Sequence, residues 1–97
     1  MKGFIVAGLG NPGTQYEHNR HNIGFMFVDY LVSKHELRWS GSSKWNGSIC
    51  RSSLWGEAVC LVKPFLFMNR SGQTIAAVAA FYNISPDNIL VVHDDLD

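Results

Sequence analysis

The sequence predicts an α/β fold with a mixed, mostly parallel twisted sheet and flanking helices. Short apolar runs at residues 4–7 and 89–92 have no polar alternation, which is typical of parallel strands buried on both faces. Between them lie two stretches with helical spacing and one pair of β-prone runs joined by a turn. With 97 residues, the chain has room for one domain at most. We therefore expect residues 1–97 to form one α/β domain or part of one.

The first strand, residues 4–7, is ended by glycines and followed by a polar loop that reaches Asn22. A helix is predicted next, ending near Glu36 or Leu37, because apolar residues recur there at helical spacing. The expected apolar face comprises Ile23, Met26, Phe27, Tyr30 and Leu31. Residues 38–44 contain glycine and serines, which predicts a loop.

Residues 45–51 and 58–62 are expected to form an antiparallel hairpin around Trp55 and Gly56, with Pro64 ending the second strand. Cys50 and Cys60 fall in these two strands and are potential cross-strand neighbours. Two cysteines are too few for a disulfide scaffold, so we expect them to be reduced, semi-buried thiols.

The second helix is indicated by Ile75, Val78, Ala79 and Tyr82, with Asn69 or Ser71 as its cap. A turn at residues 85–87 leads to the last apolar strand, which we expect to be central and parallel. A central strand needs cover on both faces, and two helices supply little of it. The chain therefore looks unfinished, and we expect these 97 residues alone to be poorly stable or to self-associate.

Composition narrows the function. The chain is 46% hydrophobic and 16% charged, which excludes disorder, and its apolar stretches are far shorter than a membrane span. We expect a cytoplasmic protein. The net charge is zero, but all eight Lys and Arg residues lie at or before Arg70, and four of the eight acids follow it. A basic surface can therefore lie beside an acidic site.

The glycines at positions 8, 10 and 13 match a dinucleotide-binding pattern after a strand. That mode of binding needs a helix that begins within the motif. Here the helical pattern begins about ten residues later, which disfavours an NAD-dependent oxidoreductase. Glycines that serve a strand-to-loop turn are the simpler interpretation.

Three polar segments follow predicted strands or precede a helix. Residues 11–22 hold two histidines, three asparagines and an arginine. Histidine is suited to general-base chemistry at neutral pH, and a carboxylate in residues 93–97 could orient it. A Mg²⁺ site on Asp94, Asp95 and Asp97 is the competing interpretation. Residues 65–69 form either core plus a helix cap or one wall of a cleft.

Three motifs carry a resemblance to a known family. Residues 8–13 with Tyr16 and residues 20–22 resemble the opening signature of bacterial-type peptidyl-tRNA hydrolases. Residues 67–72 and 88–97 are similar to that family's second and third signatures. The motifs occur in the family's order and are spread over the whole chain.

The resemblance implies hydrolysis of the ester between a peptide and the 3′ end of tRNA, without metal or cofactor. It implies that His21 is the catalytic base, that Asp94 pairs with it and that Asn69 lies beside it in the active site. Asn11 is expected to bind the peptide part. The remaining residues expected at the substrate cleft are Tyr16, Asn22, Phe67 and Met68.

The chain departs from the family pattern at Asn19 and Leu66, where the family commonly has threonine. Family members are also longer, so the resemblance implies that residues 1–97 are the N-terminal portion of a single α/β domain. The additional part is expected to supply a further asparagine, a lid and more basic surface. Family members are expected to be monomeric. The possible tRNA phosphate contacts in this chain are Arg20, Lys44, Lys63 and Arg70. A module that binds the peptide part without turnover is the alternative function.

Overall fold

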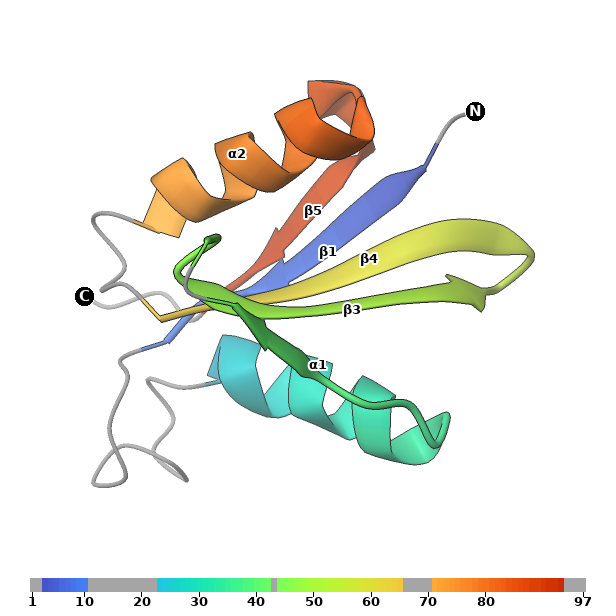
Figure 1. Cartoon of the computed structure of the whole chain (residues 1–97). Helices are drawn as coiled ribbons and strands as arrows, with labels where there is room; N and C mark the ends of the chain where they lie inside the picture. Colours follow the sequence, from blue (N-terminus) through green and yellow to red (C-terminus); the bar gives the residue numbers. More distant parts are fainter. Residues whose placement is uncertain (1–2, 11–22, 43, 66–70, 94–97) are drawn as a thin grey trace.

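The computed structural model describes residues 3–10, 23–42, 44–65 and 71–93. They form three layers, with α1 (Ile23–Lys34) on one face of a five-stranded sheet and α2 (Ser71–Tyr82) on the other (Figure 1). The strands are β1 (Phe4–Gly8), β2 (Ser40–Ser42), β3 (Gly47–Leu54), β4 (Glu57–Pro64) and β5 (Ile89–Val92). A short 3-10 helix, η3 (Pro86–Asn88), precedes β5. The predicted α/β class is confirmed.

The sheet has the order β2-β3-β4-β1-β5. β1 pairs in parallel with β4 and with β5, whereas β2-β3 and β3-β4 are antiparallel. β1 is buried along its length apart from Phe4, because it lies between two parallel neighbours and under both helices. The mixed character of the sheet is thus confirmed, with parallel and antiparallel pairings in equal number among the described strands.

The β3–β4 hairpin turns at Trp55 and Gly56, as the sequence predicts. Both residues have positive φ (53° and 75°), as expected for the primed turns that match the twist of a two-residue hairpin. The strands alternate between two cores. Ile49, Cys60 and Val62 face α2, and Cys50 and Leu61 face α1. Cys50 and Cys60 are therefore buried free thiols on opposite faces, and the expectation that they are cross-strand neighbours is wrong.

The helix ends follow from backbone hydrogen bonds. At the end of α1, Glu36 has φ 55° and Leu37 N donates to Val32 O at 2.8 Å. The same pattern ends α2, where Ile84 N donates to Ala79 O at 2.8 Å. Bonds of this span close a helix with a left-handed residue. Consequently α1 ends at Lys34, slightly before the predicted Glu36 or Leu37.

The predicted apolar face of α1 is confirmed at Leu31 and wrong at its other four residues. Its buried residues are Gly24, Val28, Leu31 and Val32, whereas Ile23, Met26, Phe27 and Tyr30 are exposed. The reason is a close approach of the helix backbone to the sheet, which only a small residue permits. On α2 the prediction is confirmed, because Ile75, Val78 and Ala79 are buried and Tyr82 packs against them.

Two further expectations are corrected. The predicted loop at 38–44 contains β2, which pairs with the edge of β3 through Ser40, Gly41 and Ser42. β5 is parallel to β1 as expected, but it is the edge strand of the described sheet, with Leu90 57% exposed. Within the described ranges, no helix is long and apolar enough to cross a membrane.

Candidate active site

The strands and helices that flank the predicted catalytic segments all begin or end at one edge of the sheet (Figure 1). β1, β4 and β5 run in the same direction and all end there, and both helices begin there. In an open α/β sheet, ligands bind outside the carboxyl ends of parallel strands. We refer to this side of the molecule as the site edge.

β1 and β5 end together at the site edge. Gly8 is in register with Val92, and Leu9 N donates to Val92 O at 2.9 Å. The chain leaves β1 toward residue 11 and leaves β5 toward residue 94 from adjacent positions. The ends of β1 and β5 therefore lie side by side, and the segments that follow them, 11–22 and 94–97, are outside the described residues.

Two glycines hold the start of α1 against these strand ends. A Cβ on Gly24 would lie 2.2 Å from Val92 O, 2.3 Å from Leu9 N and 2.4 Å from Leu9 O. A Cβ on Gly8 would lie 2.1 Å from Gly24 O. These distances are too short for real carbon atoms, so both positions require glycine. Neither a dinucleotide motif nor a simple turn explains Gly8; its role is this backbone contact.

β4 and α2 meet the site edge on the other side of β1. Pro64 is the last residue of β4, and Phe65 N donates to Asn46 O at 2.7 Å just beyond it. α2 begins at Ser71, which is buried. The described residues on either side of 66–70 thus lie at the end of β4, which neighbours β1, and at the start of α2.

Most predicted site residues lie outside the described residues. They are His21, Asp94, Asn69, Asn11, Tyr16, Asn22, Phe67, Met68, Arg20 and Arg70. Their roles remain predictions, as does the alternative Mg²⁺ site at the end of the chain. The described residues contain no cluster of three or more His, Cys, Asp or Glu that could hold a metal ion.

The two described candidates for phosphate contact differ in their surroundings. Lys63 Nζ is 2.8 Å from Asp29 Oδ1, an oxygen that also accepts a hydrogen bond from Trp39 Nε1 at 2.9 Å. Lys63 is therefore committed to α1 and the loop after it. Lys44 is exposed and lies over the Trp45 ring, 4.8 Å from its centroid. Of these two lysines, Lys44 is the one available to a partner.

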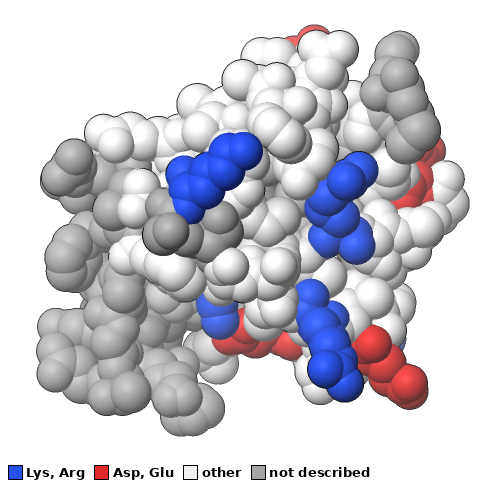
Figure 2. Space-filling view, in the orientation of Figure 1, with Lys and Arg blue, Asp and Glu red and all other residues white. Residues whose placement is uncertain are grey.

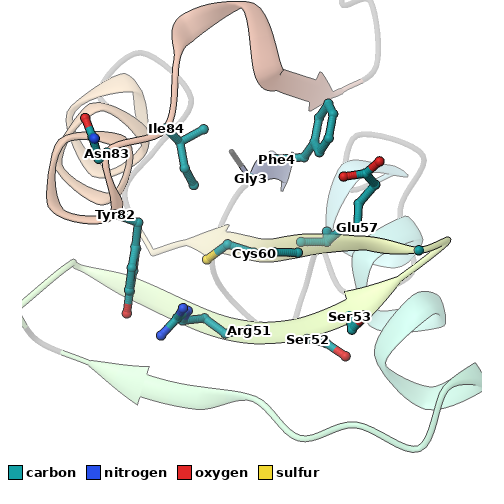
Figure 3. A pocket seen from close by; sticks show the side chains of 13 residues that line it. Gly3, Phe4, Arg51, Ser52, Ser53, Glu57, Cys60, Tyr82, Asn83 and Ile84 are labelled. Atoms are coloured by element: carbon teal, nitrogen blue, oxygen red, sulfur yellow. The ribbon is translucent and has the colours of Figure 1, made fainter. Parts of the chain in front are cut away.

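A hollow of about 800 Å³ lies at the opposite edge of the sheet, between the end of α2 and the β3–β4 hairpin (Figure 3). Its lining includes Arg51, Ser52, Cys60, Tyr82 and Asn83. Burial raises the pKa of the Cys60 thiol to about 12, although the Arg51 charge opposes this shift. Cys60 is therefore an inert thiol rather than a nucleophile, and the hollow is separate from the site edge.

The architecture is that of an open-sheet α/β protein with its candidate site at the carboxyl ends of parallel strands. A family model described as peptidyl-tRNA hydrolase matches residues 5–97. The chain belongs to the peptidyl-tRNA hydrolase family.

Individual relatives agree with this assignment. A Neisseria meningitidis peptidyl-tRNA hydrolase is 53% identical over 93 residues, which cover 96% of this chain and 48% of the relative. One from Listeria welshimeri is 48% identical and is covered to 50%. The crystal structure of peptidyl-tRNA hydrolase from Acinetobacter baumannii superposes with a TM-score of 0.90 at 41% identity, covering 98% of this chain and 48% of that one. The chain spans about half the length of the relatives it matches.

Proposed function

We propose that this chain carries the catalytic segments of a cytoplasmic peptidyl-tRNA hydrolase, which cleaves the ester between a peptide and the 3′ end of tRNA. The observation that carries the proposal is the junction of β1, β5 and α1. Gly24, three residues after His21, lies against the backbone of Val92, two residues before Asp94. Chain connectivity therefore favours an encounter between His21 and Asp94 at the site edge.

The proposed chemistry assigns one task to each polar residue. His21 takes a proton from the attacking water, and Asp94 orients the His21 ring and stabilises its charged form. Asn69 holds the water or the developing oxyanion through its amide. Asn11 binds the peptide carbonyl or amide, which favours N-blocked aminoacyl groups over free amines. No metal or cofactor is required for this scheme.

The test is release of an N-blocked amino acid from tRNA by the purified chain and its variants. We expect His21→Ala to lower the rate by about 10²–10⁴-fold, the size of general-base catalysis. His35→Ala is the matched control, because His35 is exposed and lies at the edge of the sheet opposite the site. Its ring centroid is 6.4 Å from that of Trp55 in the β3–β4 turn. Equal rates for these two variants would contradict the role of His21.

A second pair of variants tests Asp94. We expect Asp94→Asn to reduce the rate strongly with a smaller effect on substrate binding. Asp87→Asn is its control, because Asp87 is exposed and lies in η3, before β5. A rate unchanged by Asp94→Asn would remove the orienting role.

The alternative is a module that retains the peptide-binding groove without turnover. Binding of N-blocked aminoacyl-tRNA without release, lost on substitution of Asn11, would favour that alternative.

A further inference from the structure

Two cations lie over a cluster of three aromatic rings at the β3 side of the molecule. We call this surface the cation–aromatic face and define it as Lys44, Trp45, Arg51, Phe81 and Tyr82. Lys44 Nζ is 4.4 Å from the Phe81 ring centroid, and Arg51 Cζ is 4.3 Å from that of Tyr82. The rings contact one another, with centroids 5.2 Å apart for Trp45–Phe81 and 4.9 Å apart for Phe81–Tyr82.

The cations of this face are held by rings rather than by carboxylates. In the described part of the chain, neither Lys44 nor Arg51 forms a salt bridge with an acidic side chain, in contrast to Lys63 with Asp29. Both side chains are exposed, and Phe81 is 59% exposed. Lys and Arg side chains dot the surface shown in Figure 2, whereas the acidic side chains lie toward its rim. Exposed cations fixed beside an exposed ring suit a partner that has both phosphates and flat bases.

The face runs from the loop before β3, on the side of the site edge, to Phe81 and Tyr82 at the end of α2 that is farther from that edge (Figure 1). Lys44 and Trp45 precede Gly47, which pairs with Pro64 at the end of β4. Arg51 lies four residues further along β3, roughly 13 Å at the usual rise per residue. Beyond Arg51 and Tyr82 the surface continues into the hollow, where Ser52, Ser53 and Asn83 add polar groups (Figure 3).

We propose that the cation–aromatic face binds the tRNA strand that leads to the ester. Lys44 and Arg51 neutralise backbone phosphates, and the Phe81 ring supports an unstacked base. The hollow accepts the next part of the strand. The proposal rests on the proposed function, because RNA is the partner that a peptidyl-tRNA hydrolase must hold close to its site edge.

The test measures binding of fluorescently labelled, deacylated tRNA to the 97-residue chain by anisotropy at several salt concentrations. We expect the double variant Lys44→Gln/Arg51→Gln to bind about tenfold or more weakly at low salt. Its plot of log affinity against log salt becomes shallower by about 1.4 to 1.8, the contribution of two phosphate contacts. Phe81→Leu weakens binding by about fivefold or more and leaves the slope unchanged, because it removes a stacking ring and no charge.

Lys34→Gln is the matched control. Lys34 is also exposed and also lies over a ring, 5.7 Å from the Tyr30 centroid, but it belongs to α1 on the opposite face of the sheet. We expect its affinity and slope to match those of the unsubstituted chain. Circular dichroism of each variant checks that the fold is retained.

The outcomes separate this proposal from the proposed function. Binding of deacylated tRNA requires no ester cleavage, so an inactive chain would count against the proposed function alone. Unchanged affinity and slope in the double variant would overturn the cation–aromatic face. So would a loss no larger than that of Lys34→Gln, or an absence of tRNA binding by the unsubstituted chain.

Discussion

Replacement of Gly24 by alanine tests how tightly the site edge is constructed. The added Cβ would lie 2.2–2.4 Å from three backbone atoms of Leu9 and Val92, none of which can rotate away as a side chain does. Overpacking costs about 1–3 kcal/mol, and three backbone clashes place this case at the upper end. Alanine recovers about 1 kcal/mol because it favours helix more than glycine does.

The expected net loss is therefore about 2 kcal/mol of unfolding free energy. In a domain of this size, that loss lowers Tm by roughly 8–16 °C. The assay is thermal unfolding of both proteins followed by far-UV circular dichroism under identical conditions.

Gly72→Ala is the matched control. Gly72 also lies in a helix, α2, but a Cβ there meets nothing within 4 Å. We expect its Tm to stay the same or to rise, because helix propensity then acts alone. A Gly24→Ala protein as stable as Gly72→Ala would refute the inferred contact between α1 and the two strand ends.

Three further changes test other parts of the structure. Gly56→Ala should lower the unfolding free energy by about 1 kcal/mol, because residue 56 has φ 75°, although an added Cβ would meet only open space. Gly41→Ala, where an added Cβ is equally free and φ is not positive, should cost less in the same urea titration. Asp29→Ala should lower the unfolding free energy by at most about 1 kcal/mol, since the Asp29–Lys63 pair is partly exposed, and the loss should shrink in high salt. In the folded chain, burial raises the pKa of Cys60 to about 12, whereas the thiol of an unfolded chain has a pKa near 8.5. The contribution of Cys60 to the unfolding free energy should thus be constant below about pH 8.5 and decline toward about pH 12. The Cys60→Ala protein should lose less stability over this range, and equal losses in the two proteins would contradict this explanation.

The sequence predicts the strands well because their apolar content and their turn chemistry agree. Residues 4–7, the Trp55–Gly56 turn and Pro64 each mark a boundary that the structure retains. β2 escapes prediction because Ser40, Gly41 and Ser42 have little strand propensity, and they form a strand only by pairing with β3.

Hydrophobic periodicity could not predict which face of α1 is buried against the sheet. A count of large apolar residues selects Ile23, Met26, Phe27, Tyr30 and Leu31, of which Leu31 alone is buried. Contact with the sheet is decided instead by Gly24, the residue that allows the closest approach. The sequence did contain a signal for this contact, a glycine within a helical pattern. Glycine adds nothing to a hydrophobic periodicity, so the pattern did not reveal the buried face.

The family was predictable from motifs, whereas the cation–aromatic face was not; the roles of the motif residues remain predictions. Three signatures in order identify the family without any knowledge of the fold. Arg51 and Phe81 are thirty residues apart in sequence, and neither belongs to a signature. Only the packing of α2 against the sheet brings their neighbourhoods together.

The backbone contact between Gly8 and Gly24 places the start of α1 directly against the end of β1. The end of β1 and the start of α1 are thus held together by touching backbones. This junction is made by the backbones of Gly8, Leu9, Gly24 and Val92, so it does not depend on a side chain of residues 11–22. Side-chain changes within residues 11–22 are therefore expected to leave the junction of β1 and α1 intact, whereas a side chain at Gly8 or Gly24 would force it apart.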